Sequence, residues 1–396
     1  MSANYVDQEG IVINTGSKRL TLRSNMETKI GDKFKIGLNI SASRSKTHNL
    51  FVDGARSSSD NRGGILSILT YNPTIPTRNP DGTYYDLQPQ SVGSILVNPI
   101  AVQTEANNND LIDRLGINLN MSYDFTSNFN YTLIAASNVR QSRGEDYTLI
   151  PDGSSLVPPK AGFQTGTLTN YQISNILTYN KDFGNTKLIL TGVYEVTNVE
   201  NRTANGGSGA YSLTDIPDAF YLADELGTVQ TIRVHKTDKT LESFVGRAQI
   251  KVGNNLNVTG ALRVDKSSTF SPENRTGYFP TASASYSFKD MLSDDGLFNN
   301  ITLRAGWGQV GNDGDALGIY SSFNSPSYSF NGTTLTNALG YGGKVDPNLK
   351  WEATEQTSVG LDFALLKNVL NVSVDWYKKN TVDLLLSRPI DYALGD

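Results

Sequence analysis

The amino-acid sequence predicts an all-β protein, an antiparallel transmembrane β-barrel of about 12 strands with long extracellular loops. Three observations support this prediction: apolar residues recur at every second position, small polar residues fill the positions between them, and the connections are alternately short and long. A period of two is the strand period, so each segment has one apolar face and one polar face. Such strands suit a barrel with lipid outside and a polar lumen inside.

The alternation is clearest in the segment 115–125, LGINLNMSYDF. Its odd positions are apolar, whereas Gly, Asn, Ser and Asp fill the even positions. Similar alternation predicts twelve strands, which in chain order cover 18–30, 34–43, 115–125, 129–135, 171–179, 188–196, 244–252, 256–264, 282–288, 301–307, 359–365 and 370–376.

The connections between these strands alternate in length. Gly31 and Asp32 form a hairpin dipeptide after the first strand. A stretch of about 65 residues follows the second strand, which is unusual for a compact domain. Outer-membrane barrels have short periplasmic turns and long extracellular loops. Further short turns are expected at 126–128, 183–185, 253–255 and 367–368, moderate connections at 267–276 and 289–299, and long loops at 141–167, 199–240 and 311–354.

A soluble β-sandwich is the alternative fold, because its strands have the same period. Its outward face should be rich in Lys, Glu and Thr, whereas Gly, Asn and Ser dominate here. The strand pairs are also longer than the usual five or six residues of soluble strands. Both observations favour the membrane barrel.

Composition and motifs exclude several classes of protein. The net charge is −5 and basic residues are interspersed with acidic ones, so no nucleic-acid partner is expected. The absence of Cys excludes a disulfide framework and a thiolate metal site. His48 and His235 fall in expected loops, far apart, where a solvated side chain is the ordinary reading. No Ser-His-Asp arrangement, phosphate-binding glycine loop or metal-spaced histidine pair is found, which predicts no enzyme, no cofactor and no metal site.

Several segments resemble one family. They are YFPTASASYSF at 278–288, LRAGWGQVGND at 303–313 and VDPNLKWEATEQTSVGLDF at 345–363. Together with LRSNMETKIGDKFKIGLNISASRS at 22–45 and NVSVDWYKKNTVDLLL at 371–386, they are similar to the SusC/RagA family of TonB-linked outer-membrane receptors of Bacteroidetes-type bacteria. The resemblance covers most of the chain, in order.

The resemblance implies nutrient uptake through the outer membrane of a Gram-negative bacterium. Family members form barrels of roughly 22 strands, plugged by an N-terminal domain. It implies three partners: a SusD-like surface lipoprotein that closes the mouth over an oligosaccharide or peptide substrate, a TonB complex that acts through the plug region, and membrane lipid. On this view residues 1–396 are a partial receptor barrel, and we expect the plug domain, the signal peptide and the C-terminal strands to be absent.

The long loops contain clusters of aromatic residues. Amphipathic rings suit interfaces with one wet side, so these residues are candidates for contact with a ligand or with the lid protein. Packing of the loops on themselves, or an interfacial aromatic belt, is the alternative reading. The candidates are Tyr84, Tyr85, Tyr211, Phe220, Tyr221, Tyr320, Phe323, Tyr328, Phe330 and Tyr341.

Carboxylates give weaker indications. GNDGD at 311–315 and SDDG at 293–296 could suggest calcium, but neither has the spacing of a calcium loop, so turns are expected. Four further carboxylates lie in expected strands, and no role is assigned to them: Asp124, Asp265, Asp362 and Asp375.

Two other functions stay open from the sequence. One is a soluble or surface-attached β protein that binds glycans through its aromatic loops. The other is a small stand-alone porin. The substrate itself is not readable from the residues.

Overall fold

A computed structural model describes most of the chain. The described residues are 1–49, 68–69, 71–85, 98–148, 160–209, 229–292, 296–314, 323–324, 328–330, 333–335, 340–341, 346, 348–367 and 369–386.

The fold is dominated by one antiparallel sheet of 13 strands, in the order β1 to β11, then β16 and β17. Nearest neighbours in the chain are nearest neighbours in the sheet, which is the up-and-down order of a barrel wall. The strands of this sheet are β1 (Ser2–Glu9), β2 (Gly16–Ile30), β3 (Phe34–His48), β4 (Ala106–Asp124), β5 (Phe129–Thr148), β6 (Lys160–Asp182), β7 (Thr186–Gly209), β8 (Val229–Val252), β9 (Leu256–Ser267), β10 (Thr276–Ser287), β11 (Phe298–Asn312), β16 (Glu352–Leu365) and β17 (Leu370–Val382).

Short elements occur in the connections. A helix, α2 (Pro99–Glu105), precedes β4, and a 3-10 helix, η3 (Lys289–Met291), follows β10. Two small two-stranded sheets pair β12 (Phe323–Asn324) with β15 (Gly340–Tyr341), and β13 (Tyr328–Phe330) with β14 (Thr333–Leu335).

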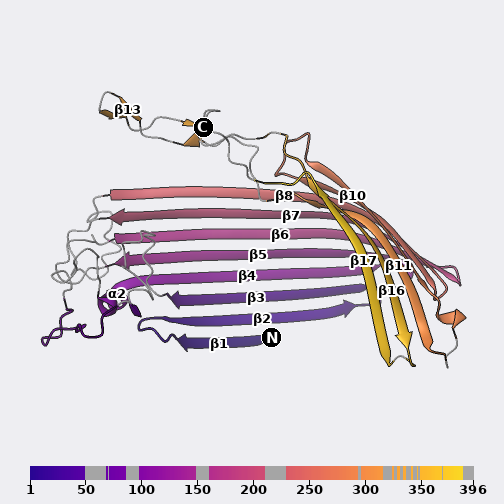
Figure 1. Ribbon diagram of the computed structural model, residues 1–396, viewed down its shortest axis with the longest axis horizontal. Coiled ribbons are helices and arrows are strands. Elements are labelled where there is room, and N and C mark those ends of the chain that lie inside the picture. Colours follow the sequence, from indigo (N-terminus) through magenta and orange to yellow (C-terminus); the bar gives the residue numbers. More distant parts are fainter. Residues whose placement is uncertain are drawn as a thin grey trace.

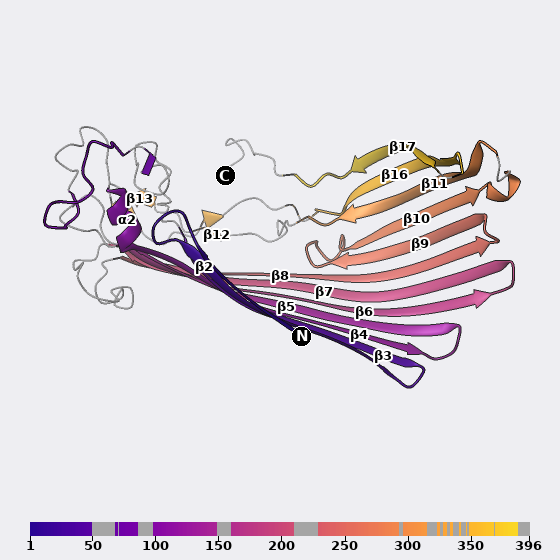
Figure 2. The ribbon, with the colours of Figure 1, turned by 90° about the horizontal axis from the view of Figure 1, so that it is seen from below.

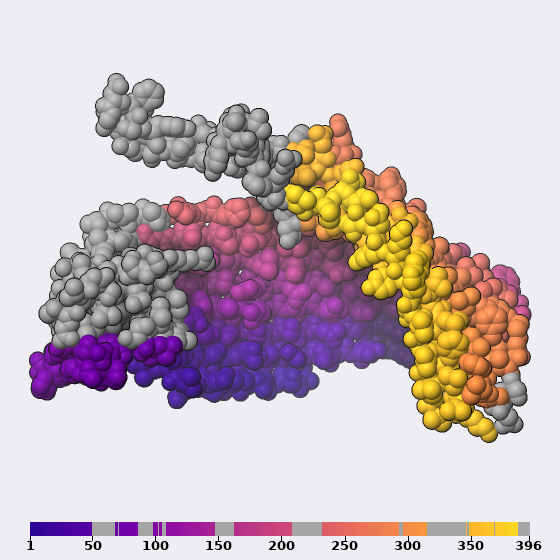
Figure 3. Space-filling model, in the orientation of Figure 1, coloured from indigo at the N-terminus to yellow at the C-terminus, as the bar shows by residue number. Residues whose placement is uncertain are grey.

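The large sheet is curved and open. Strands β1 to β8 form a broad floor, and β9 to β17 rise from it as a side wall (Figure 1, Figure 2). β1 and β17 are the two edges and do not pair with each other, so the described strands form part of a larger barrel. Figure 3 looks into the hollow side of this trough, with β17 in the foreground.

The strand register aligns the apolar positions into rows on the convex face. One such row crosses five strands through Leu38, Leu119, Ala135, Ile173 and Val196. These side chains lie on one face because the side-chain period of a strand is two and no register slip interrupts the row. The apolar face is uncovered: Phe244 is 51% exposed and Trp376 is 58% exposed.

An aromatic cluster marks the short-turn end of the convex face. The Tyr123 and Phe125 rings are 4.9 Å apart, and Phe125 is 5.6 Å from Phe129. The turns at this end are tight, since Gly31 and Gly184 adopt left-handed conformations with φ of 62° and 81°. An apolar band flanked by aromatic residues is typical of membrane barrels.

The sheet lacks a conventional core in the part of the chain that is described. Only Ala101, Phe270 and Phe279 are buried apolar residues there. A soluble sandwich would bury one face of each sheet against the other. The single open sheet with an uncovered apolar face is therefore not a sandwich. Across the described ranges, no helix is long and apolar enough to span a membrane.

The structure confirms the twelve expected strands and adds β1. It also corrects their lengths: β7 and β8 have 24 residues each and extend far into the segment 199–240, which was expected to be a loop. His48 ends β3 and His235 lies within β8, so neither is in a loop. The cause is that backbone pairing continues beyond the apolar band, where both faces are polar and the alternation disappears.

Candidate functional site

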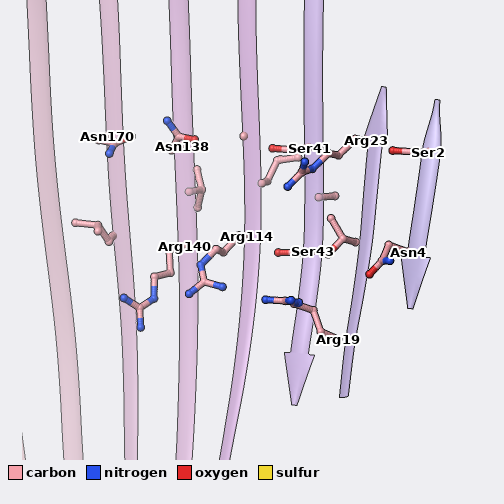
Figure 4. Close-up of a pocket in the computed structure, with 16 residues that line it drawn as sticks. Ser2, Asn4, Arg19, Arg23, Ser41, Ser43, Arg114, Asn138, Arg140 and Asn170 are labelled. Atoms are coloured by element: carbon pink, nitrogen blue, oxygen red, sulfur yellow. The ribbon is translucent and has the colours of Figure 1, made fainter. Parts of the chain in front are cut away.

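Four arginines gather on the concave face of the floor, around a hollow of about 570 Å³. Arg19 and Arg23 come from β2, Arg114 from β4 and Arg140 from β5 (Figure 4). All four side chains are exposed. The volume falls within the range of about 300–1,000 Å³ that is usual for small-molecule sites. We call this set the arginine hollow.

The strand register explains why these side chains converge. Arg114 lies directly opposite Arg140 in the β4–β5 ladder, and Arg23 lies opposite Ser41 in the β2–β3 ladder. Directly opposed residues have Cβ atoms about 4.5–5.5 Å apart, and like charges at that separation are destabilising. The sheet therefore holds two guanidinium groups close together at an energetic cost.

No carboxylate from the sheet offsets this charge. The hollow contains no Asp or Glu among its lining residues, and none of the four arginines makes an ion pair within the described ranges. On their own strands and this face, the nearest acids to Arg23 and Arg114 are Glu27 and Asp110, four residues away. That distance is about 13 Å along a strand.

Neutral hydrogen-bonding groups complete the lining. Asn138 and Asn170 lie beside the arginines, and Ser41 and Ser43 lie between them (Figure 4). Gly116 opens the floor, because a Cβ there would lie 2.8 Å from Ser41 Oγ and 2.9 Å from Asn138 Oδ1. The hollow thus offers amide, hydroxyl and guanidinium groups, together with some apolar surface from Ala42, Leu115, Val139 and Leu168.

The hollow lies toward the long-loop end of the barrel wall. On the convex face beside it, apolar Leu115 is followed two residues along by Asp113, which pairs with Arg44. Arg44 Nε and Asp113 Oδ1 are 2.6 Å apart. The hollow is therefore level with the upper border of the apolar band.

The arginines of the side wall have carboxylate partners instead. Arg304 Nε donates to Asp362 Oδ2 at 2.6 Å, and its Nη2 donates to Asp375 Oδ1 at 3.0 Å. Gly360 leaves room for this guanidinium, since a Cβ there would lie 2.8 Å from Arg304 Cζ. Hence Asp362 and Asp375, to which the sequence assigned no role, bind the Arg304 guanidinium within the sheet.

A second pair in the wall is more deeply buried. Arg263 Nε donates to Asp265 Oδ2 at 2.7 Å, and its Nη2 donates to Ser243 Oγ at 2.9 Å. Asp265 is only 6% exposed. Asp124, on the floor, accepts a 2.7 Å hydrogen bond from Asn130 Nδ2. All four strand carboxylates therefore have partners within the described sheet.

Two of the segments that carry the family resemblance contribute Phe279 and Trp351 to an aromatic cluster at the loop end of the wall. We call this cluster, which Phe270 completes, the aromatic knot. The Trp351 ring lies 5.4 Å from Phe270 and 5.3 Å from Phe279. Trp351 Nε1 donates to Arg275 O at 2.9 Å. Gly311 is required beneath Phe279, because a Cβ there would collide with the ring. These residues fix the wall and leave little surface for a ligand.

Asp313 belongs to a neighbouring polar cluster. It accepts hydrogen bonds from Lys239 Nζ at 2.9 Å and from fully buried Ser267 Oγ at 2.7 Å. Gly314 has φ of 58°, and its N–H donates to Asn312 Oδ1. This part of GNDGD is therefore a turn anchored by a lysine. In the described ranges, no three His, Cys, Asp or Glu side chains are grouped to hold a metal ion.

Tyr84 and Tyr85 lie in the rim segment 71–85 and are half-buried. The Arg78 guanidinium stacks 4.4 Å from the centre of the Tyr84 ring. Tyr85 N donates to Thr77 O at 3.1 Å, and Asn98 Nδ2 donates to the same carbonyl at 2.6 Å. Each tyrosine is thus held by its own loop, which matches the loop self-packing that the sequence left open.

Hydrogen bonds stiffen this rim segment at both ends. Asn98 Oδ1 accepts from Ile100 N and Ala101 N and so caps α2, with Pro99 as the first helical residue. Hydrogen bonds from the Thr83 hydroxyl and backbone N–H lower the pKa of Asp81. Burial, followed by the nearby Tyr85 phenol, raises the pKa of Tyr71.

The other aromatic candidates are not brought into a described site. Phe323, Tyr328, Phe330 and Tyr341 lie on the short strands β12, β13 and β15. Tyr211, Phe220, Tyr221 and Tyr320 lie outside the described residues. Their roles stay predictions.

The arginine hollow was not predicted from the sequence. Its signal was nonetheless present, since Arg19, Arg23, Arg114 and Arg140 all occupy polar positions of alternating strands. What the sequence lacks is the register that joins strands separated by long loops.

An open antiparallel sheet with an uncovered apolar convex face and a polar concave face defines part of an outer-membrane type of β-barrel. The family model described as TonB dependent receptor-like, beta-barrel matches residues 47–396, so the chain belongs to the TonB-dependent receptor β-barrel family.

Individual relatives agree with this family. The chain is 29% identical to TonB-dependent receptor P3 of Formosa agariphila and 25% identical to TonB-dependent receptor SusC of Bacteroides thetaiotaomicron. The alignments cover 100% and 98% of this chain but only 39% and 40% of those proteins. The solved structure of the RagAB peptide transporter matches all of this chain and 44% of its own chain, with a TM-score of 0.80 and 18% identity. The last match concerns the fold alone.

Proposed function

We propose that this chain is the barrel segment of a SusC-like, TonB-dependent transporter that takes up oligosaccharides or peptides through the bacterial outer membrane. The observation that carries the proposal is the two-faced sheet: apolar residues cover the convex face, and the concave face of the floor is predominantly polar. Such a wall separates lipid from a hydrated lumen wide enough for a solute.

The proposed partners follow from the family. A SusD-like surface lipoprotein would close the loop end, and a TonB complex would supply the force for import through a plug. The name of one structural relative mentions peptides, and the Formosa and Bacteroides relatives are receptors of the same family. The rim segment 71–85 and the short strands β12 to β15 lie at the loop end, where a lid would contact them.

A soluble glycan-binding protein is not favoured. Large apolar side chains such as Ile173 and Leu177 are 43% and 45% exposed on the convex face, and no second sheet covers them in the described ranges. A stand-alone porin is not favoured either, because β1 and β17 leave the sheet open and unpaired edges are costly in lipid.

Deletion of the gene tests the proposal. The deletion strain and its parent are grown on panels of oligosaccharides and of peptides as the limiting nutrient, with the corresponding monomers as controls. We expect slower growth on at least one polymer and normal growth on its monomer, and a proton uncoupler should abolish uptake of that polymer by the parent. Unchanged growth on every polymer, or a protein recovered in the soluble fraction without detergent, would contradict the proposal.

A further inference from the structure

We infer that the arginine hollow binds the carboxylate or sulfate groups of an acidic oligosaccharide. This inference rests on the proposed function and narrows its substrate class. It depends on residues of the described floor and not on the aromatic loops.

The positive charge of the hollow favours an anionic ligand. The hollow collects four guanidinium groups, two of them directly opposed across β4 and β5, without a carboxylate in its lining. Guanidinium groups bind carboxylate and sulfate oxygens through paired N–H donors, which makes arginine the usual residue for such anions. An anion placed between Arg114 and Arg140 would convert a repulsive pair into a bridged one.

The arginines of the side wall serve as a comparison for those of the hollow. In the wall the sheet itself contains the carboxylates: Arg304 is paired with Asp362 and Asp375, and Arg263 is paired with Asp265. The same fold therefore neutralises lumenal arginines in one region and leaves them unneutralised in another. The clustering of four arginines without a carboxylate, which a single unpaired arginine such as Arg247 does not share, marks the hollow as the place where negative charge from outside the sheet is bound.

The neutral lining favours a sugar over a peptide or a packed protein segment. Asn4, Asn138, Asn170 and the serines between the arginines offer donors and acceptors for hydroxyl groups. Protein interfaces have an apolar and aromatic centre. No aromatic residue lines the hollow, and polar groups outweigh its apolar members, which are Ala42, Leu115, Val139 and Leu168. Its height, level with the upper border of the apolar band, would place it beneath the loop end, where a captured solute enters.

Calorimetric titration of the protein, purified in detergent as its gene encodes it, tests the inference. The probes are tetragalacturonate and its methyl ester, and a sulfated galactose tetrasaccharide and its desulfated form. Each pair differs in charge but not in length. We expect at least one charged probe to bind roughly tenfold or more tightly than its neutral partner. Arg114→Gln combined with Arg140→Gln should abolish that preference without changing the affinity for the neutral probe.

Arg247→Gln is the matched control. Arg247 is an exposed arginine on the concave face of β8, outside the hollow, so its loss removes one positive charge from the same face and should leave the preference intact. A folded, heat-modifiable band on gels verifies that each variant is intact.

Three results would overturn the inference. One is equal affinity for the charged and neutral members of both pairs. Another is tighter binding of tetra-aspartate than of either charged sugar, which would indicate a peptide ligand. The third is a double variant with unchanged affinities but a lower melting temperature, which would indicate that another part of the protein pairs with these arginines. The gene-deletion test is independent of these titrations. It can therefore demonstrate uptake even if the titrations show no preference for acidic sugars.

Discussion

Lumenal arginines of the side wall are paired with carboxylates of the sheet, whereas those of the arginine hollow in the floor are not. In the wall, Arg304 and Arg263 donate to carboxylates on their own or the neighbouring strand, at 2.6 and 2.7 Å. In the floor, Arg114 faces Arg140 with no acid beside either. The wall arginines therefore stabilise the barrel, whereas the floor arginines lower its stability and are available to a ligand. The difference teaches that residue type alone does not assign a role, because the strand register decides which partner each arginine meets.

Removal of the aromatic knot should have the largest effect on stability. Trp351→Ala loses the contacts with Phe270 and Phe279 and the hydrogen bond to Arg275 O. Fully buried aromatic residues cost about 3–5 kcal/mol when truncated to Ala, and because Trp351 is half-buried the cost should lie toward the lower end. Urea unfolding, followed by loss of the heat-modifiable band, measures this cost. Trp351→Phe is the control and should recover most of the loss. A cost below about 1 kcal/mol would show that the wall does not depend on the knot.

Loss of Arg263, the partner of the buried Asp265, should have the next largest effect. Arg263→Gln leaves the Asp265 carboxylate, 6% exposed, without its cationic partner. Hydrogen bonds to charged groups are worth about 1.5–3 kcal/mol, so unfolding should become easier by that amount. Adding Asp265→Asn should restore much of the stability. If the double variant is as unstable as the single one, the pair is not what stabilises this strand.

Salt should change the affinity of the floor arginines for a charged ligand. Binding of a charged sugar to the floor arginines should weaken roughly tenfold between low and high salt, because exposed charges are screened. Binding of the neutral partner should not change. Titration at two sodium chloride concentrations measures this difference. Salt-independent binding of the charged probe would break the assignment of the hollow to anions.

The smallest effect is expected on the convex face. Arg44→Gln removes the exposed pair with Asp113, in which the arginine side chain is 66% exposed. Exposed pairs contribute little to stability, because water and salt screen them. Urea unfolding in low salt should show a much smaller change than for the Arg263 variant. A larger cost would mean that pairing above the apolar band stabilises the barrel as much as pairing in the lumen does.

Alternation predicted the strands wherever one face is apolar. It failed at β1, where Asp7 and Glu9 share the convex face with Tyr5, and at the long ends of β7 and β8. In those places the strands are paired through backbone hydrogen bonds and polar cross-strand contacts such as Lys18–Asp7 and Lys236–Glu200, so the side chains show no apolar period.

The site was harder to predict than the fold. Arg23 and Arg114 approach each other only through β3, and a connection of 57 residues separates β3 from β4. The sequence gives no register across such a connection. The aromatic knot was not predicted for the same reason, because Phe270 and Trp351 come from different connections. The sequence drew attention to the loop aromatics; Tyr84 is stacked on Arg78 within its own loop, and contact of these residues with a ligand or lid stays a prediction.

Urea unfolding of Arg304→Gln and Arg114→Gln, side by side, tests the central comparison most directly. Arg304→Gln strips Asp362 and Asp375 of their shared cation and should lower the free energy of unfolding. Arg114→Gln relieves a repulsion with Arg140 and should leave stability unchanged or raise it by up to about 0.5 kcal/mol. Equal destabilisation by both variants would contradict the account, because it would mean that the floor arginines are paired in the folded protein.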